Sequence, residues 1–360
     1  MADSGKTKRD LRPGTRPTLI DIAEAAGVSK ATVSLVLRNS TTIPQRTHER
    51  VHQAAAALGY VYNRGAASLR STRTRLIAMA VNDLINPYFA EIVAAIEDAL
   101  TAQNRIVLMS NTAESVARQS AFVSAVREYN VDGLLCVPAM GTDAAFIEQL
   151  RAWRLPCVLV SRGVPGADVD LVQADHRAGM VEAARHLIAL GHRRIGMLGL
   201  NEHISTGRQR FEGYRQALME AGIPLEPRLV LSGPATRDTG LAQIGTLLDL
   251  PEPPTAVVCF NDVVAFGAML GLRARNLVPG PDFSVVGFDD IAEATLWRPA
   301  LTSVAVARQL VGRTAASLLL ERIENFDAPA RTVLLPTQLV IRDTTCPPPA
   351  QAAGKAKRKR

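Results

Sequence analysis

The sequence predicts an α/β protein with a small all-helical unit at its N-terminus and a larger α/β core. Two observations lead to this fold class. Residues 18–37 read as two short helices meeting at a glycine, and from residue 76 onward apolar runs alternate with amphipathic helical spans. Apolar strands that alternate with helices are typical of parallel sheets covered by helices on both faces. Because a core of roughly 270 residues is larger than a single domain usually is, we expect two subdomains with a cleft between them.

Residues 18–37 have the pattern of a helix-turn-helix. Thr18 with Asp21 three positions later is a capping box, which starts a helix, and Gly27 ends that helix where a tight turn needs a positive φ. Ser29 then caps a second helix that continues the apolar face. In this motif the second helix places its first side chains in the major groove of DNA, whereas the alternative is an ordinary helical hairpin inside a core.

The distribution of charge supports contact with nucleic acid. Residues 1–75 hold 13 Lys and Arg against 5 Asp and Glu, and the tail from Gln351 adds five basic residues and no acidic one. The rest of the chain has 23 basic and 29 acidic residues. Positive charge gathered at a helix-turn-helix is the electrostatic signature of a phosphate-binding surface. We therefore expect double-stranded DNA as a partner.

Composition divides the chain into five parts. A third helix is expected to begin at Pro44, a favoured first helical residue, and to stop at Gly59. The basic stretch that follows is poor in core-forming side chains and reads as a hinge. The predicted parts are a disordered basic arm (1–17), a helix-turn-helix domain (18–62), a hinge helix or linker (63–75), the core (76–345) and a basic tail (346–360).

The core is read as alternating strands and helices. The predicted strands are 76–81, 105–110, 133–137, 157–161, 194–198, 256–260 and 283–287, and the predicted helices include 89–103, 179–190 and 208–220. Ligands of such folds bind at the carboxyl ends of the parallel strands, so a binding cleft is expected there.

Other classes of protein lack support in the sequence. There is no G-x-G-x-x-G after a strand, no P-loop and no G-x-S-x-G, and no histidine has a partner that suggests a catalytic triad. The four cysteines are widely separated and show no metal-ligand spacing. No secretory signal or apolar run of ~20 residues is present, which argues against a secreted binding protein or a membrane protein. We expect a cytoplasmic protein that is not an enzyme and uses no cofactor or metal.

Ten motifs occur in an ordered series along the chain. They are TLIDIAEAAGVSKATVSLVL (18–37), LGY (58–60), AASL ending at Leu69, NPYF (86–89), VDGLL (131–135), GHRRIG (191–196), RQRFEGY (208–214), FND (260–262), VVGFDD (285–290) and PALTSV (299–304). Together they resemble the lactose-repressor/galactose-repressor (LacI/GalR) family of transcription regulators, from residue 18 to about residue 345. The resemblance implies a DNA-binding headpiece, a hinge helix and an effector-binding core similar to periplasmic sugar-binding proteins, in a homodimer on a pseudo-palindromic operator.

Several headpiece residues are expected to contact DNA. Lys30 can donate to guanine, and Ala31 and Thr32 suit a thymine methyl. The resemblance implies backbone-phosphate contacts by Thr18, Ser29, Ser34, Thr47 and Asn63, although Thr18 and Ser29 could act as helix caps alone. It also implies that Leu69 wedges into the minor groove with Arg70 supplying charge beside it, the alternative being that Leu69 packs the hinge on the core. Leu35 stands where the family commonly carries arginine, so no family operator is carried over.

Seven core residues are expected to bind the effector: Asn82, Tyr88, Phe89, Ser161, Arg210, Asn261 and Asp289. A guanidinium and a carboxylate such as Arg210 and Asp289 can each take two hydroxyls or a carboxylate or amide edge. Asn261 could only cap a helix, and Phe89 could only pack in a core. Ser161 stands where relatives often have Asp, which weakens the case for a plain sugar.

The resulting functional prediction is a DNA-binding transcriptional regulator controlled by a small molecule. We expect a repressor of carbohydrate or related catabolic genes whose effector is a sugar or sugar derivative. A nucleoside or purine effector, or action as an activator, remains open. After Asp343 three prolines and no leucine heptad follow, so dimers rather than tetramers are expected. The basic tail is either a solvated end or a non-specific DNA arm.

Overall fold

The structure, a computed structural model, describes residues 17–37, 40–60 and 73–349. It divides into two units, Met1–Thr74 and Arg75–Arg360, which have separate hydrophobic cores. The predicted disordered arm, the hinge and the basic tail lie outside the described residues except at their edges.

The first unit is a three-helix headpiece. Its helices are α1 (Leu19–Ala26), α2 (Lys30–Val36) and α3 (Gln45–Ala57), which confirms the helix-turn-helix and the third helix. Ile22, Val33, Val36 and Val51 are fully buried where the three helices meet. Pro44 precedes the third helix as its cap instead of being its first residue.

The turn between α1 and α2 forms as the sequence predicts. The backbone N–H of Thr18 donates to Oδ2 of Asp21 at 2.7 Å, which closes the capping box, and Gly27 adopts a φ of 61°. Oγ of Ser29 accepts a hydrogen bond from the N–H of Thr32 at 3.1 Å and thereby caps α2. Arg50 of α3 donates to the carbonyl of Gly27 at 3.3 Å, so the third helix also fixes the turn.

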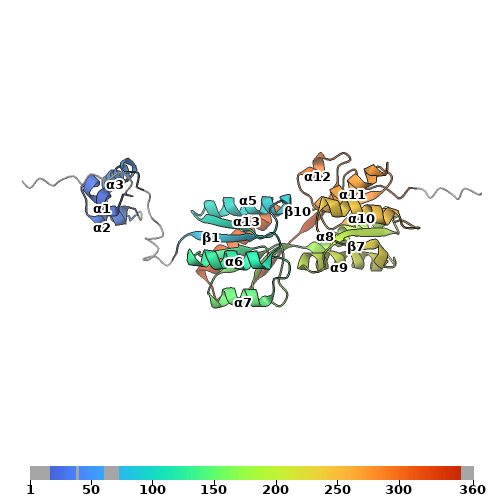
Figure 1. The fold of residues 1–360 in the computed structure, drawn as a ribbon, viewed down its shortest axis with the longest axis horizontal. Coiled ribbons are helices and arrows are strands. Elements are labelled where there is room, and N and C mark those ends of the chain that lie inside the picture. The colour runs from blue at the N-terminus through green and yellow to red at the C-terminus, as the bar shows by residue number, and fades with distance from the viewer. Residues whose placement is uncertain (1–16, 38–39, 61–72, 350–360) are drawn as a thin grey trace, which may run out of the picture. The chain divides into compact units, whose positions relative to one another are not determined.

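The core consists of two α/β subdomains. The first contains β1 (Leu76–Val81), β2 (Ile106–Asn111), β3 (Gly133–Cys136), β4 (Cys157–Val160), β5 (Asp170–Ala174) and β11 (Thr332–Leu335), in the sheet order β11-β5-β4-β3-β1-β2. Its helices are α5 (Pro87–Thr101), α6 (Val116–Glu128), α7 (Ala144–Ala152) and α13 (Arg308–Glu324). Alternate residues of β1 face opposite helix layers, so Ile77 and Met79 join the cluster under α5 and α13 while Ala78 and Ala80 join the one under α6 and α7 (Figure 1).

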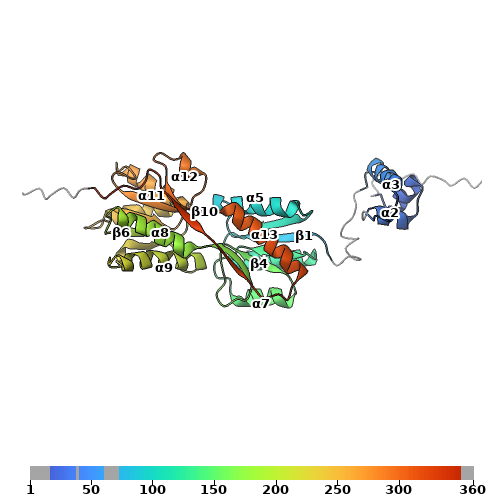
Figure 2. The same cartoon turned by 180° about the vertical axis from the view of Figure 1, so that it is seen from behind.

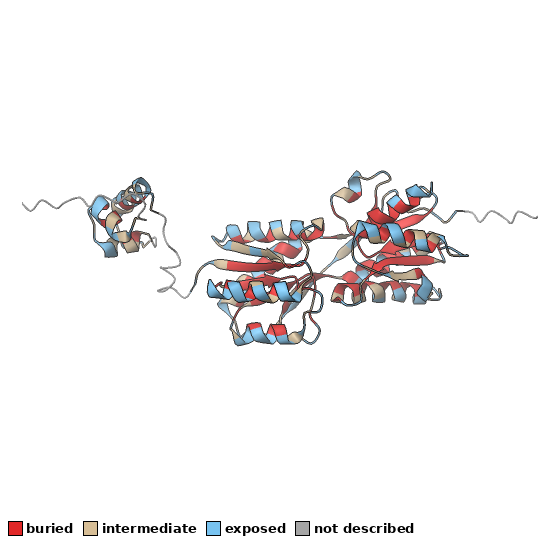
Figure 3. Ribbon diagram, viewed as in Figure 1, coloured by how far each residue is buried: buried red, intermediate tan, exposed pale blue. Residues whose placement is uncertain are grey.

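The second subdomain repeats this design. It contains β6 (Ile195–Leu200), β7 (Val230–Ser232), β8 (Ala256–Cys259), β9 (Ser284–Asp289), β10 (Thr302–Val306) and β12 (Thr337–Val340), in the sheet order β12-β10-β9-β8-β6-β7. The helices are α8 (His176–Ala189), α9 (Ser205–Glu220), α10 (Arg237–Leu248), α11 (Asp262–Ala274) and α12 (Glu293–Leu296). In Figure 3 the central strands of both sheets are buried and the helices expose their outer faces.

The chain passes between the subdomains three times, after β5, after β10 and after β11. Figure 2 shows the last of these passages as the long strand segment that runs from one sheet into the other. A fold with three such passages permits the two sheets to be tilted about a common hinge, and it leaves the carboxyl ends of their strands facing each other.

The structure corrects the sequence prediction at three points. β12 runs antiparallel to β10, whereas the other described strand pairs are parallel as expected. The strands β5, β7, β10, β11 and β12 were not predicted, because they are short or mix polar with apolar residues. Helix α5 begins two residues before its predicted start, and α8 begins three residues early because Asp175 caps it by accepting from the N–H of Ala178.

Candidate functional site

A cleft of about 350 Å³ lies between the two subdomains at the carboxyl ends of their strands. Its volume falls in the range of small-molecule sites. All seven residues predicted to bind the effector line it. The lining residues are Asn82, Asp83, Asn86, Tyr88, Phe89, Glu114, Met140, Ser161, Arg162, His176, Asn201, Ile204, Thr206, Arg210, Pro234, Ala235, Thr236, Phe260, Asn261 and Asp289.

The first subdomain contributes an aromatic wall. Asn86 caps α5 and so directs Tyr88 and Phe89, on the first turn of the helix, into the cleft. The two rings contact edge to face, with centroids 5.0 Å apart. The hydroxyl of Tyr88 lies 3.0 Å from Oγ of Ser161, and burial raises the pKa of this phenol to about 12. Tyr88 is therefore a neutral hydrogen-bonding group at physiological pH.

The second subdomain contributes a buried ion pair. Nη2 of Arg210 on α9 donates to Oδ1 of Asp289 at 3.0 Å, and Nη1 donates to the carbonyl of Phe260. The guanidinium lies over the ring of Phe288 at 3.8 Å and over that of Phe260 at 4.6 Å. Burial raises the pKa of Asp289 to about 6, against the opposing effect of Arg210. The aspartate is thus mostly ionised at pH 7, ready to accept hydrogen bonds from hydroxyl groups.

His176 holds the arginine from the other side. Its Nδ1 lies 3.2 Å from Nη2 of Arg210. Because a guanidinium can only donate, Nδ1 is the acceptor and the ring proton sits on Nε2. Burial and the neighbouring Arg210 move the pKa of His176 well below its usual range, so the ring is neutral.

Asn261 acts as a cap and also lines the cleft. Its side chain accepts from the N–H of Val264 at 3.0 Å, which starts α11. The residue is 1% exposed and contributes to the cleft wall. Capping uses only the oxygen of the amide, so the two alternatives left open by the sequence are compatible.

Strained backbone surrounds the cleft. Glu114, Ser161 and Asp289 have φ values of 57°, 64° and 104°, in the region that non-glycine residues rarely occupy. Such conformations persist where the surrounding structure holds them, and they gather at functional sites.

Sequence reasoning missed Glu114, Arg162 and His176. Nη1 of Arg162 donates to Oε2 of Glu114 at 3.0 Å, and both line the cleft. Each of the three residues follows a strand of the first sheet. That position, at the carboxyl ends of the strands, was the available signal.

The predicted DNA contacts gather at the start of α2 and in the helices beside it. Lys30 and Ala31 are exposed on the first turn, and Thr32 and Ser34 are half-buried. Oγ of Ser29 lies 2.9 Å from Oγ1 of Thr32, so both hydroxyls already share a local contact. Thr18 is exposed before α1, and Thr47 is half-buried in α3. Asn63, Leu69 and Arg70 lie outside the described residues.

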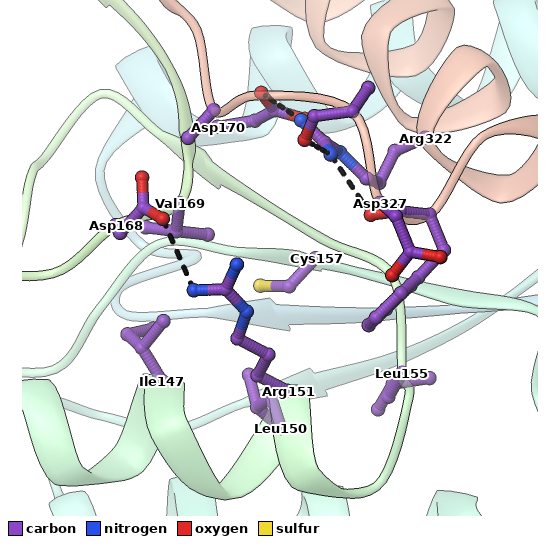
Figure 4. A pocket seen from close by; sticks show the side chains of 13 residues that line it. Ile147, Leu150, Arg151, Leu155, Cys157, Asp168, Val169, Asp170, Arg322 and Asp327 are labelled. Carbon is purple, nitrogen blue, oxygen red and sulfur yellow. Dashed lines mark hydrogen bonds and ion pairs between the residues drawn. The ribbon is translucent and has the colours of Figure 1, made fainter.

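A second cavity, of about 60 Å³, lies in the first subdomain between α7 and the end of α13 (Figure 4). Arg322 donates to both carboxylate oxygens of Asp170 at 2.7 and 2.9 Å and to the carbonyl of Pro329 at 2.9 Å. These partners tie the loop after α13 to β5. We assign this cavity a structural role because its central arginine is occupied by the protein itself.

Among the residues that the structure describes, no helix combines the length and apolar character needed to cross a membrane. In the same residues, no three His, Cys, Asp or Glu side chains are grouped so that they could hold a metal ion.

Comparison with known proteins identifies two matching family models. Residues 18–63 match "Bacterial regulatory proteins, lacI family". Residues 74–343 match "Periplasmic binding proteins and sugar binding domain of LacI family". The boundary between these matches coincides with the boundary between the two structural units.

Curated relatives and solved structures cover nearly the whole chain. The HTH-type transcriptional repressor CytR of Escherichia coli (strain K12) is 32% identical over 92% of this chain and 97% of its own length. The regulator DegA of Bacillus subtilis (strain 168) is 30% identical over 92% of this chain and 99% of its own length. The Lac repressor dimer bound to operator and the anti-inducer ONPF superposes with a TM-score of 0.84 at 29% identity, over 92% of this chain and 100% of that one. The regulator CelR in complex with cellobiose superposes with a TM-score of 0.70 at 32% identity, over 91% of this chain and 100% of that one. The chain therefore belongs to the LacI family, and it is a transcriptional regulator with a helix-turn-helix DNA-binding domain and an effector-binding core.

Proposed function

We propose that the protein is a cytoplasmic repressor of catabolic genes that binds a pseudo-palindromic operator as a homodimer and is controlled by a sugar or sugar derivative in the cleft. The observation that carries the proposal is the buried pair of Arg210 and Asp289 in a cleft between two hinged subdomains. A ligand that contacts both walls favours the tilt of the subdomains that it fits. It changes DNA affinity only by its different affinities for the two states.

The headpiece supports the DNA-binding part of the proposal. The exposed first turn of α2, with Lys30 and Ala31, has the geometry of a recognition helix. Ser29, Ser34 and Thr47 are proposed to hold phosphates, and Leu69 and Arg70 to act in the minor groove. The solved relative with the Lac repressor fold is a dimer on its operator, which supports the same assembly here.

Exposed leucines support the homodimer. Leu241 of α10, Leu270 of α11 and Leu296 of α12 are 43%, 42% and 71% exposed. The three helices lie together on one side of the second subdomain, as Figure 1 shows, and the ring of Trp297 after α12 stacks on Phe266 of α11 at 4.9 Å. Apolar side chains exposed on neighbouring helices favour an interface on this side of the subdomain. Sedimentation of the protein and of Leu270→Arg tests this: the wild type should be a dimer and the variant should dissociate, whereas a tetramer or an unchanged variant contradicts the assignment.

The effector class has a second candidate. A solved relative holds cellobiose and another holds ribose, which favours a sugar. Relatives often have aspartate at the position of Ser161, so this chain lacks that carboxylate on the first wall of the cleft. The difference favours an effector with fewer hydroxyls, such as a nucleoside. An operator recovered by selection from random DNA, titrated with and without candidate effectors, tests the proposed control. Operator affinity should shift in the presence of one class of effector.

A further inference from the structure

We propose that Arg162 selects the effector, and that the effector carries a planar group with two adjacent hydrogen-bond acceptors, namely a carboxylate or the O6–N7 edge of a guanine-type base. The inference rests on the proposed function of the cleft and extends it to the chemistry of the ligand.

The first step is that Arg162 is held rigidly on one side. Its Nη1 donates to Oε2 of Glu114 at 3.0 Å and to the carbonyl of Pro138 at 3.3 Å. Oε1 of Glu114 also accepts from Nδ2 of Asn82 at 2.8 Å, and Oε2 accepts from the N–H of Met140 at 2.9 Å. The carboxylate that orients Arg162 is therefore itself fixed by two further donors. Both hydrogens of Nη1 are engaged.

The second step is that the other edge of the guanidinium is open. Nε and Nη2 of Arg162 have no hydrogen-bond acceptor within residues 17–37, 40–60 and 73–349. The side chain lines the cleft and is 10% exposed, and its guanidinium lies 5.8 Å above the ring of Phe89. An Nε–Nη2 edge is a planar pair of donors, which matches a carboxylate or two adjacent acceptors of a base in a bidentate contact.

The third step is that the first wall offers few acceptors to a polyol. The hydroxyl of Ser161 is paired with Tyr88, and both oxygens of Glu114 are occupied. Oδ1 of Asn82 is a buried acceptor without a hydrogen-bond partner in the described part of the chain. Asp289 supplies a carboxylate acceptor on the opposite wall. An acceptor-bearing planar group therefore fits at Arg162, with hydroxyl groups of the same molecule directed toward Asp289.

Calorimetric titration of the full-length protein tests the proposal with four probes. D-Glucuronate presents a carboxylate, guanosine presents the adjacent O6 and N7 acceptors of its base, and D-glucose and D-ribose present neither. Glucuronate or guanosine should bind at least tenfold more tightly than both neutral sugars. Arg162→Lys should weaken that binding at least tenfold, because an ammonium cannot make the bidentate contact. Arg151→Lys, a matched change at an exposed ion pair of the same subdomain, should leave it unchanged.

Glu114→Gln distinguishes an effector with a carboxylate from one with a neutral pair of acceptors. Removing the negative charge beside Arg162 should strengthen the binding of glucuronate relative to that of guanosine. Thermal unfolding of each variant establishes that it is folded.

Three results overturn the inference. They are tighter binding of glucose or ribose than of the other probes, unchanged affinity in Arg162→Lys, or no binding of glucuronate and guanosine at millimolar concentration. If a neutral sugar binds and Arg210→Lys abolishes that binding, the proposed function of the cleft stands and only the effector chemistry is wrong. If a probe binds and Arg210→Lys has no effect, the cleft assignment itself fails.

Discussion

Oδ1 of Asp289 lies 3.0 Å from Nη2 of Arg210, although the two residues are 79 positions apart in the chain. The carboxylate stands at the end of β9 and the guanidinium on α9, and both side chains are buried. Two charges removed from water depend on each other, because either alone would pay the full cost of desolvation. The pair therefore fixes the shape of the second wall of the cleft.

Removing one partner should destabilise the protein more than removing both. We expect Arg210→Met to lower the free energy of unfolding by about 3–5 kcal/mol, since it leaves the buried charge of Asp289 unpaired. Adding Asp289→Asn should recover a large part of this loss, because the remaining amide needs no counter-charge. Chemical unfolding of the two single variants and the double variant measures the coupling. Additive losses would show that the two side chains do not act as a pair.

The pKa of Asp289 should be visible in the stability of the protein. Its folded value of about 6 lies above the ordinary 3.8, so the folded state binds more protons between these two pH values. This group's contribution to stability should therefore fall as the pH rises through 6 and level off above it. Asp262 has a raised pKa as well, but it remains in both proteins when the wild type is compared with Asp289→Asn. Between pH 4 and 7 the free energy of unfolding should decrease less in Asp289→Asn than in the wild type. Identical pH profiles of the two proteins would contradict this prediction.

Ser29→Asp should separate helix capping from phosphate binding. Aspartate is a good N-cap and suits the helix dipole, so the headpiece should keep its stability. Its negative charge should repel a phosphate, so affinity for every DNA sequence should fall. Ser29→Ala should lose about 1 kcal/mol of headpiece stability as well. Circular dichroism melting and anisotropy with labelled DNA give the two readouts, and unchanged DNA affinity in Ser29→Asp would assign this residue to capping alone.

Lys30→Ala should relax sequence preference at one base pair of each half-site. The expected cost is ~1–3 kcal/mol on the preferred operator and little on operators already changed at that base pair. Thr47→Ala is the comparison, because loss of a phosphate contact weakens binding to all sequences alike. Competition among a set of single-base operator variants distinguishes the two patterns. Uniform weakening in Lys30→Ala would reassign the lysine to phosphate.

The sequence predicted β2, which is partly exposed, and six strands that are buried except at Leu76. β1, β3, β4, β6, β8 and β9 are continuous apolar runs, and hydrophobicity alone reveals them. β11 alternates exposed and half-buried residues over four positions, and β12 has one exposed and three half-buried residues. Both patterns are too short to stand out. β12 pairs with β10 across a passage between subdomains, and no local signal specifies that antiparallel contact.

The candidate site was predictable where it coincides with a motif. Tyr88, Arg210 and Asp289 lie within motifs of the family, and all three line the cleft. Glu114 and Arg162 belong to no motif, and they meet across 48 residues of sequence. Their contact depends on the left-handed backbone at Glu114, which sequence patterns do not encode. The contact between Glu114 and Arg162 is set by long-range packing, and so only the structure shows it.

The central claim is that a ligand in the cleft controls DNA binding through Arg210, and an operator titration with and without effector tests it most directly. Fluorescence anisotropy of a labelled operator should show an effector-dependent shift in the wild type. Arg210→Ala, with Arg210→Lys as the variant that keeps a counter-charge for Asp289, should retain operator affinity within a few-fold and lose the shift. Leu69→Ala should do the reverse, losing specific operator affinity while calorimetry still detects effector binding. A normal effector response in both Arg210 variants would contradict the account.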